Sequence, residues 1–190
     1  MALGSCSGRC GRPAGGVQTV TTLYEDEALF LAHSVALEQE AAQRLYELAN
    51  TMDVHNNREL QGLLLELAAY SEHHALAVEA LCQGRTLPSL RAWEYSWPQE
   101  ESPEVFHYAR VHYLMTAEQA LQVALEVEQN ARGFYEDVAR RSGNPALAEL
   151  ASRFAGEEAE HVQALQARLQ VLQSAAALDN TDFDPPHMPE

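Results

Sequence analysis

The chain contains no lysine, and all 12 of its basic residues are arginine. Schiff-base catalysis requires a lysine amine, and the P-loop of nucleotide hydrolases requires a lysine for its phosphates, so both are excluded. Basic charge is scarce altogether, because 28 acidic residues give a formal net charge of -16. A surface of this sign repels phosphate backbones and anionic lipid headgroups and attracts cations. We therefore expect neither nucleic acid nor a membrane as a partner.

Cysteine and long apolar runs are also scarce. The three cysteines, Cys6, Cys10 and Cys82, are too few for a disulfide framework in a chain of 190 residues. The N-terminal residues lack the apolar core of roughly 7–15 residues that a signal peptide has, and no run reaches the roughly 20 apolar residues of a membrane span. We expect a cytoplasmic protein. The spacing of Cys6 and Cys10 fits a metal or redox pair weakly, and a chance spacing explains it equally well.

No segment shows the period-two alternation of a half-buried strand, whereas a 3.6-residue period is sustained in four segments. These predicted helices span residues 24–50, 58–82, 116–142 and 145–174. Capping residues mark their ends. Asn56 and Asn57 precede the second segment, Thr116 and Gln119 form a capping-box pattern at the third, and the sequence GNP at 143–145 separates the third from the fourth.

The lengths of the connections predict the topology. Short links join the first helix to the second and the third to the fourth, so each pair should form an antiparallel hairpin. A long crossover, residues 83–115, rich in proline and aromatic residues, joins the two hairpins. This is the connectivity of ferritin-like bundles. We expect an all-α, ferritin-like four-helix bundle over residues 23–174, between a flexible glycine-rich leader, 1–22, and an acidic proline-rich tail, 175–190.

Each predicted helix carries polar or charged residues inside its apolar stripe. Following each stripe in steps of three and four residues leads in turn to Glu38, to Ser71 and His74, to Glu128, and to Glu158 and His161. An ionised carboxylate in an apolar interior must be paired, neutralised or bound to a metal. Residues three apart on a helix project from one face, which would let the last two of these bind a common metal.

The two predicted hairpins repeat this pattern. EQEA at 38–41 corresponds to EQNA at 128–131, and SEHH at 71–74 corresponds to EAEH at 158–161. The correspondence indicates an internal duplication, in which the charged positions lie at matching depths of the bundle.

These residues resemble the rubrerythrin branch of the ferritin-like superfamily. That family places a Glu on each of two helices and a Glu-x-x-His on each of the other two, around a non-haem di-iron centre. The resemblance implies metal ligands at Glu38, His74, Glu128, Glu158 and His161. It implies one or two iron ions, although carboxylate and imidazole ligands also suit zinc or manganese.

The same resemblance implies a function. The expected protein is an oxidoreductase that reduces hydrogen peroxide or dioxygen. The iron ions would supply the two electrons that reduce the O–O bond. Rubrerythrins also hold a rubredoxin-type iron on two Cys-x-x-Cys pairs, and that spacing is missing here. Turnover would therefore require an external electron donor.

The sequence departs from the family at Ser71, where the family has a bridging Glu. Three arrangements stay open. Glu72 could reach the site through a local distortion, although it lies about 100° further round the helix. Water could occupy the bridging position, or a single metal could bind through Glu128, Glu158 and His161.

Other interpretations compete with catalysis. The cluster could be a metal-free network of protonated histidines and glutamates. The chain could bind iron or zinc without catalysis, as a small store or a sensor, or it could be a structural bundle whose site has decayed. Glu40 lies only two residues from Glu38, and an alternative register would pair Glu38 with Glu126. We keep Glu38 as the equivalent of Glu128 and expect Glu40 and Glu126 on solvated faces.

The remaining histidines and aromatic residues favour structural roles. We expect surface or hydrogen-bonding positions for His73, His107 and His112, and a core position near the site for Tyr135. The WEYSW segment, residues 93–97, should cover the bundle or pack in a homodimer.

Overall fold

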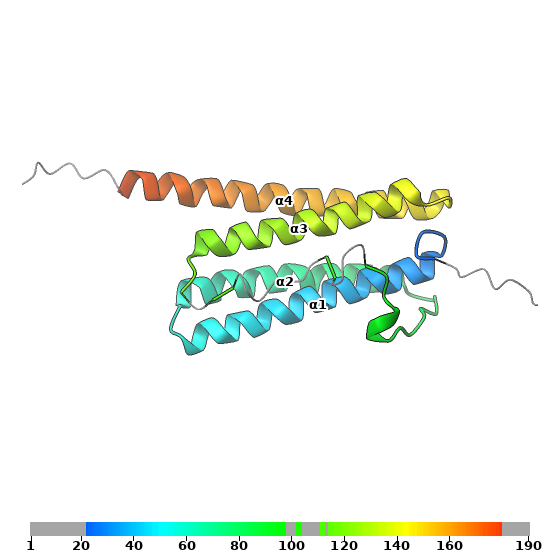
Figure 1. Ribbon diagram of the computed structural model, residues 1–190, viewed down its shortest axis with the longest axis horizontal. Coiled ribbons are helices and arrows are strands. Elements are labelled where there is room, and N and C mark those ends of the chain that lie inside the picture. The colour runs from blue at the N-terminus through cyan, green and yellow to red at the C-terminus, as the bar shows by residue number, and fades with distance from the viewer. Residues whose placement is uncertain (1–21, 98–101, 104–110, 113, 180–190) are drawn as a thin grey trace, which may run out of the picture.

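The computed structural model describes residues 22–97, 102–103, 111–112 and 114–179. Its long helices are α1 (Glu27–Val54), α2 (Arg58–Leu81), α3 (Ala117–Arg141) and α4 (Pro145–Asp179), with one 3-10 turn, η1, at Ala92–Glu94. α1 packs closely against α2, and α3 against α4, as two antiparallel hairpins that lie side by side (Figure 1). No strand occurs among the described residues. The predicted all-α, ferritin-like four-helix bundle with a long crossover is confirmed.

The predicted caps explain where the helices begin. The Asn57 side chain accepts a first-turn N–H of α2 at 3.2 Å. Thr116 and Gln119 form the reciprocal capping box of α3, with bonds of 2.9 and 3.2 Å. Asn144 accepts the N–H of Ala146 at 3.1 Å, directly after the first-position proline of α4. Each side chain satisfies a backbone donor that the helix itself leaves without a partner.

Two helices differ from the predicted ranges. α1 begins three residues later than expected, because Asp26 accepts the backbone N–H groups of Ala28 and Leu29 and so fixes the first turn. It also continues to Val54, beyond the predicted residue 50. Met52 is fully buried in this extra turn, and tertiary packing of that kind stabilises a helix more than local propensity does. α4 continues five residues past the predicted 174, to Asp179.

The core consists of two apolar clusters along the bundle axis. The first, which we call the Met52 cluster, joins the end of α1 to the start of α2 and of α3, and includes Leu64 and Leu121. The second, the Phe154 cluster, lies toward the other end and includes Phe30 and Tyr135. The charged positions of the four helices fall between the two clusters.

The described part of the crossover is fastened to the bundle by a histidine that sequence analysis did not single out. His33 is buried, and its Nε2 accepts the N–H of Ser96 at 3.0 Å. Its Nδ1 must then carry the proton, and it donates to the carbonyl of Leu29 at 2.8 Å. The rings of Tyr95 and Trp97 pack edge-on against the imidazole. The aromatic segment therefore covers the bundle, which is one of the two roles that the sequence suggested for it.

Among the described residues, none of the helices is long and apolar enough to cross a membrane. Cys82 is a free thiol, and its Sγ lies 3.2 Å from the carbonyl oxygen of Val78. Cys6 and Cys10 lie outside the described residues, as does His107.

The capping box of α3 gives a test of this architecture. Thr116→Ala removes one side-chain acceptor at the helix N-terminus, and we expect it to lower the free energy of unfolding by about 1 kcal/mol. Thr51→Ala is the matched control, because Thr51 is exposed and bonds only within its own helix, to the carbonyl of Glu47. Denaturant titration of both variants would measure the difference, and equal losses would contradict the capping assignment.

Candidate metal centre

The five predicted ligand residues converge between the two apolar clusters. His74 of α2 places Nδ1 at 2.9 Å from Oε1 of Glu38 on α1, and at 3.3 Å from Oε1 of Glu158 on α4. His161 places Nδ1 at 3.1 Å from Oε2 of Glu128 on α3, and at 3.2 Å from Oε2 of Glu158. Glu158 thus stands at the centre of a cluster to which every helix contributes.

Two buried atoms of this cluster have close neighbours but no hydrogen bond. They are Nδ1 of His74 and Oε1 of Glu158. Nδ1 of His74 nevertheless lies within ion-pair distance of Oε1 of Glu38 and of Oε1 of Glu158. One nitrogen from each histidine and one oxygen of Glu158 all lie within 4.8 Å of one another. The donor set and its spacing therefore fit a metal ion.

The three residues whose ligand atoms lie within 4.8 Å of one another differ from the three that the sequence suggested for a single metal ion. That option combined Glu128 with Glu158 and His161, whereas the most compact group contains His74 in place of Glu128. Two imidazoles and one carboxylate are a ligand combination found at mononuclear non-haem iron sites and at zinc sites.

Burial and contacts among these groups raise the pKa of four of them, Glu38, His74, Glu158 and His161. Desolvation raises the pKa of Glu158 to about 8, with further increases from the charges of Glu38 and Glu128. Desolvation also raises the pKa of Glu38. Burial alone would lower the pKa of His74, but hydrogen bonds and charge from the surrounding glutamates outweigh it and raise this pKa to about 9. A hydrogen bond to Glu128 is the main cause that raises the pKa of His161 to about 10. Without a metal, protons hold the cluster together.

An aromatic wall closes one side of the cluster. Phe154 lies 6.3 Å from the His74 ring between centroids, and Tyr135 packs edge-on against Phe154 at 5.3 Å. The Tyr135 hydroxyl donates to Oε1 of Glu38 at 3.5 Å. Tyr135 is thus a core residue at the site, in agreement with the sequence-based expectation.

Sequence analysis missed Glu157. Its Oε2 accepts the Nε2 proton of His74 at 2.7 Å, from a side chain that is 47% exposed. When the imidazole is neutral, this hydrogen bond keeps its proton on Nε2 and leaves the Nδ1 lone pair facing Glu38 and Glu158. Glu157 lies about 100° round the helix from Glu158 and therefore outside the apolar stripe of α4, along which the candidate ligands were identified. Its only signal in the sequence is its place directly before the Glu-x-x-His motif.

The structure also settles how residues 71 and 72 lie. Ser71 is buried on the inner face of α2, with its hydroxyl 3.5 Å from the carbonyl of Leu67. Glu72 is exposed and accepts the Tyr46 hydroxyl at 2.8 Å. Its carboxylate is therefore held on the surface and does not take the place of the family's bridging glutamate.

The alternative candidates lie away from the cluster. Glu40 pairs with Arg44 at 2.8 Å on the flank of α1, and Glu126 is exposed on α3. His73 and His112 are exposed. Glu38 and Glu128 both reach the histidines of the cluster, so the register that would have paired Glu38 with Glu126 is not the one adopted.

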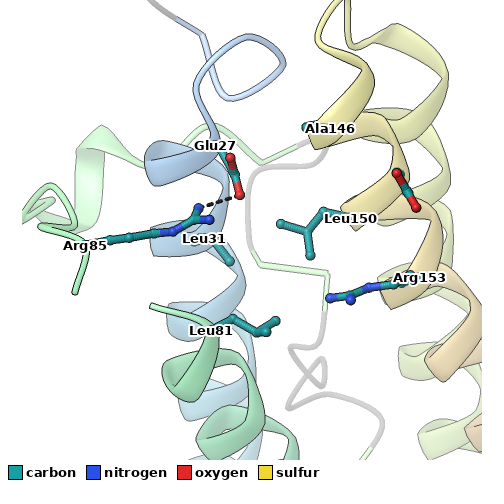
Figure 2. A pocket seen from close by; sticks show the side chains of 8 residues that line it. Glu27, Leu31, Leu81, Arg85, Ala146, Leu150 and Arg153 are labelled. Atoms are coloured by element: carbon teal, nitrogen blue, oxygen red, sulfur yellow. Dashed lines mark hydrogen bonds and ion pairs between the residues drawn. The ribbon is translucent and has the colours of Figure 1, made fainter. Parts of the chain in front are cut away.

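A cavity of about 270 Å³ reaches the cluster from one side. It is lined by Ser71 together with three of the candidate ligands, Glu38, Glu128 and His161, and by residues further out on α2 and α4. Another cavity, of about 260 Å³, lies at the end of the bundle where α1 and α4 begin (Figure 2). There Arg85 pairs with Glu27, and Arg153 projects from α4 beside Leu150 (Figure 2). No histidine lines that second cavity.

Comparison with known proteins supplies one solved structure. It is the crystal structure of COG1633, described as an uncharacterized conserved protein, from Magnetospirillum magnetotacticum MS-1. It is 38% identical to this chain, the alignment covers 75% of this chain and 93% of the other, and the TM-score is 0.57. The chain belongs to the COG1633 family. No protein-family model matches the sequence, and no curated protein matches it significantly. Membership in the COG1633 family agrees with the four-helix architecture and leaves the activity to be argued from the site.

The raised ionisation of the cluster predicts how stability depends on pH. In the unfolded chain the histidines titrate near 6.5, whereas folded His74 and His161 hold their protons to about 9 and about 10. Their stabilisation is complete below pH 6.5 and is lost as the pH rises through these folded values. Glu158 acts in the same direction between pH 4.5 and about 8. We therefore expect the thermal midpoint of the metal-free protein to fall as the pH rises from 6.5 to 9.

His161→Gln is the matched variant for this measurement, and its midpoint should fall less over the same range. Metal-saturated protein should show the opposite trend, because a bound ion displaces the protons and binds more tightly as the pH rises. A midpoint of the metal-free protein that stays level or rises between pH 6.5 and 9 would contradict the ion-pair network.

Proposed function

We propose that this chain is a rubrerythrin-like, non-haem iron protein that reduces hydrogen peroxide or dioxygen with electrons from an external donor. The observation that supports this most directly is the convergence of three carboxylates and two imidazoles at one buried point. Two of their buried atoms, Nδ1 of His74 and Oε1 of Glu158, have no hydrogen bond, and one ligand atom each of His74, Glu158 and His161 lies within 4.8 Å of the others. A purely structural network would be expected to align such atoms with one another.

In this proposal, the residues that would hold the metal are Glu38, Glu128 and Glu158, through carboxylate oxygens, and His74 and His161, through one nitrogen each. Iron, when bound, would supply the two electrons that reduction of an O–O bond requires. The chain's own groups prepare the site. Glu157 holds the proton on Nε2 of His74, which keeps Nδ1 available as a ligand.

Other side chains control the surroundings. The Tyr135 hydroxyl donates to Glu38 and so orients one carboxylate oxygen. Phe154 and Phe30 exclude water on that side, since their rings stack at 5.7 Å and both are buried. Peroxide would reach the ligands through the cavity beside Ser71. We also propose a homodimer, because Trp93 of the crossover is 75% exposed and could be covered by a second copy.

A second candidate is binding of a single iron, zinc or manganese ion without catalysis. It is favoured by the compact group of His74, Glu158 and His161, and by the serine at position 71. Three carboxylates carry less charge than the four of a symmetric site, which weakens the affinity for a second highly charged ion.

Metal content tests both candidates. Glu158→Gln keeps the size of the side chain but removes the central charge, and we expect metal affinity to fall by at least roughly 10–100-fold, the range found for residues that only support a ligand. Glu160→Gln is the matched control, because Glu160 lies on the exposed face of α4. Elemental analysis and calorimetric titration with Fe(II) would measure the two variants.

Peroxidase activity then separates the candidates. Iron-loaded protein supplied with a generic reductase should consume peroxide, and Glu158→Gln should not. Retained metal without turnover would favour the non-catalytic candidate. Absence of stoichiometric metal in the native chain, and of any thermal shift with Fe(II), Mn(II) or Zn(II), would overturn both.

Ser71→Glu restores the carboxylate that the family pattern contains. We expect the variant to raise metal occupancy toward two ions per chain, because a fourth carboxylate offsets the charge of a second ion. Ser71→Gln is the control, since it adds the same bulk without the charge. Unchanged stoichiometry in Ser71→Glu would show that position 71 does not face the metal centre.

A further inference from the structure

The cavity beside Ser71 has a composition that the proposed reduction of peroxide does not require. A channel for hydrogen peroxide needs space for a molecule of water-like size, and a water occupies about 30 Å³. The cavity measures about 270 Å³, which exceeds the roughly 150 Å³ of an engineered site that binds benzene. It is large enough for an organic molecule.

The inner end of this cavity is formed by ligand residues and by the missing carboxylate. Glu38, Glu128 and His161 line it together with Ser71. A serine side chain ends one bond beyond Cβ, so a molecule in the cavity can approach the cluster where a glutamate would otherwise extend. The neighbouring Glu72 does not compete for this place, because it is held on the surface by Tyr46.

The walls and the rim have a different chemistry. Leu67, Tyr70 and Leu165 supply apolar surface, and Arg168 lines the cavity from α4. Arg168 bonds Glu66 through Nη1 at 2.8 Å, across from α4 to α2. A guanidinium has five N–H donors, so this ion pair leaves it able to bind a second acceptor. Glu66 lines the cavity as well, so the positive charges that an anionic group would meet are Arg168 and the proposed metal, and the apolar wall fits an organic body.

We propose that the cavity binds a small organic monocarboxylate, whose carboxylate completes the metal centre at the position left open by Ser71. The inference rests on the proposed metal site. Three glutamates leave two divalent ions with a net charge of about +1, which favours an additional anionic oxygen ligand. The apolar body of the molecule lies against Leu67 and Leu165, and Arg168 favours the negative charge within the cavity.

Cobalt(II) is a suitable probe, because its visible spectrum reports on ligands without any catalytic turnover. Full-length protein is titrated with Co(II) alone, with benzoate, with benzyl alcohol, which has the same ring but no carboxylate, and with sulfate. Benzoate should raise Co(II) affinity by about tenfold, as expected for one added charged ligand, and should change the spectrum. Benzyl alcohol and sulfate should do neither.

Variants of position 71 give opposite expectations. Ser71→Ala keeps the space open and should retain the response to benzoate. Ser71→Glu supplies its own carboxylate and should lose the response while binding Co(II) more tightly. One variant should keep the benzoate response and the other should lose it. A folding defect in either variant therefore still leaves the other as a test.

Arginine variants test the rim. Arg168→Gln should weaken the benzoate response by up to roughly fivefold, as expected for a partly exposed charge that acts without direct contact. Arg153→Gln is the matched control on the same helix, because Arg153 lines other cavities and should leave the response unchanged.

The two proposals fail in distinguishable ways. Stoichiometric Co(II) binding whose affinity and spectrum are the same with and without benzoate would overturn the carboxylate site and leave the metal centre standing. Failure to bind Co(II) or Fe(II) under every condition would overturn both. An equal response to sulfate would show a general anion effect and would overturn the assignment to carboxylates.

Discussion

Five ionisable side chains, three buried and two half-buried, meet at one level of the bundle and are the constraint on which this structure depends. Glu38, Glu128 and Glu158 would each be costly as isolated buried carboxylates. Their cost is offset because His74 and His161 lie between them, within 2.9–3.3 Å. The helices must therefore keep a common depth and rotation. The Met52 and Phe154 clusters on either side supply the apolar burial that holds this alignment.

The cluster is nearly symmetric between the two hairpins, with one difference. The second hairpin keeps Glu158 and His161 three residues apart, whereas the first hairpin has Ser71 at the equivalent place before His74. The side chain of His74 is 9% exposed and that of His161 is 32% exposed. The cavity opens beside Ser71 and His161. The first hairpin thus lacks the carboxylate that Glu158 provides in the second, and the cavity lies on that side of the cluster.

Environment, more than residue type, decides what each histidine does. His33 lies in the Phe154 end of the bundle among aromatic rings, and burial lowers its pKa, so that it stays neutral and joins the crossover to α1. His74 is also buried, yet three neighbouring glutamates raise its pKa to about 9. One imidazole therefore serves as a neutral hydrogen-bonding link, while the other is a site for a proton or a metal ion.

The sequence by itself determined the four helices, the N-terminal caps of the last three and the inner position of the five candidate ligands. These features depend on local periodicity and on side chains within one turn of each helix end, so no knowledge of the fold is required. Only the tertiary structure decided that Glu157 supports His74, that Glu72 points to Tyr46, and that a cavity reaches Ser71. Each of these depends on how rotamers and helices from distant parts of the chain meet, and a stripe drawn on a single helix carries no information about its neighbours.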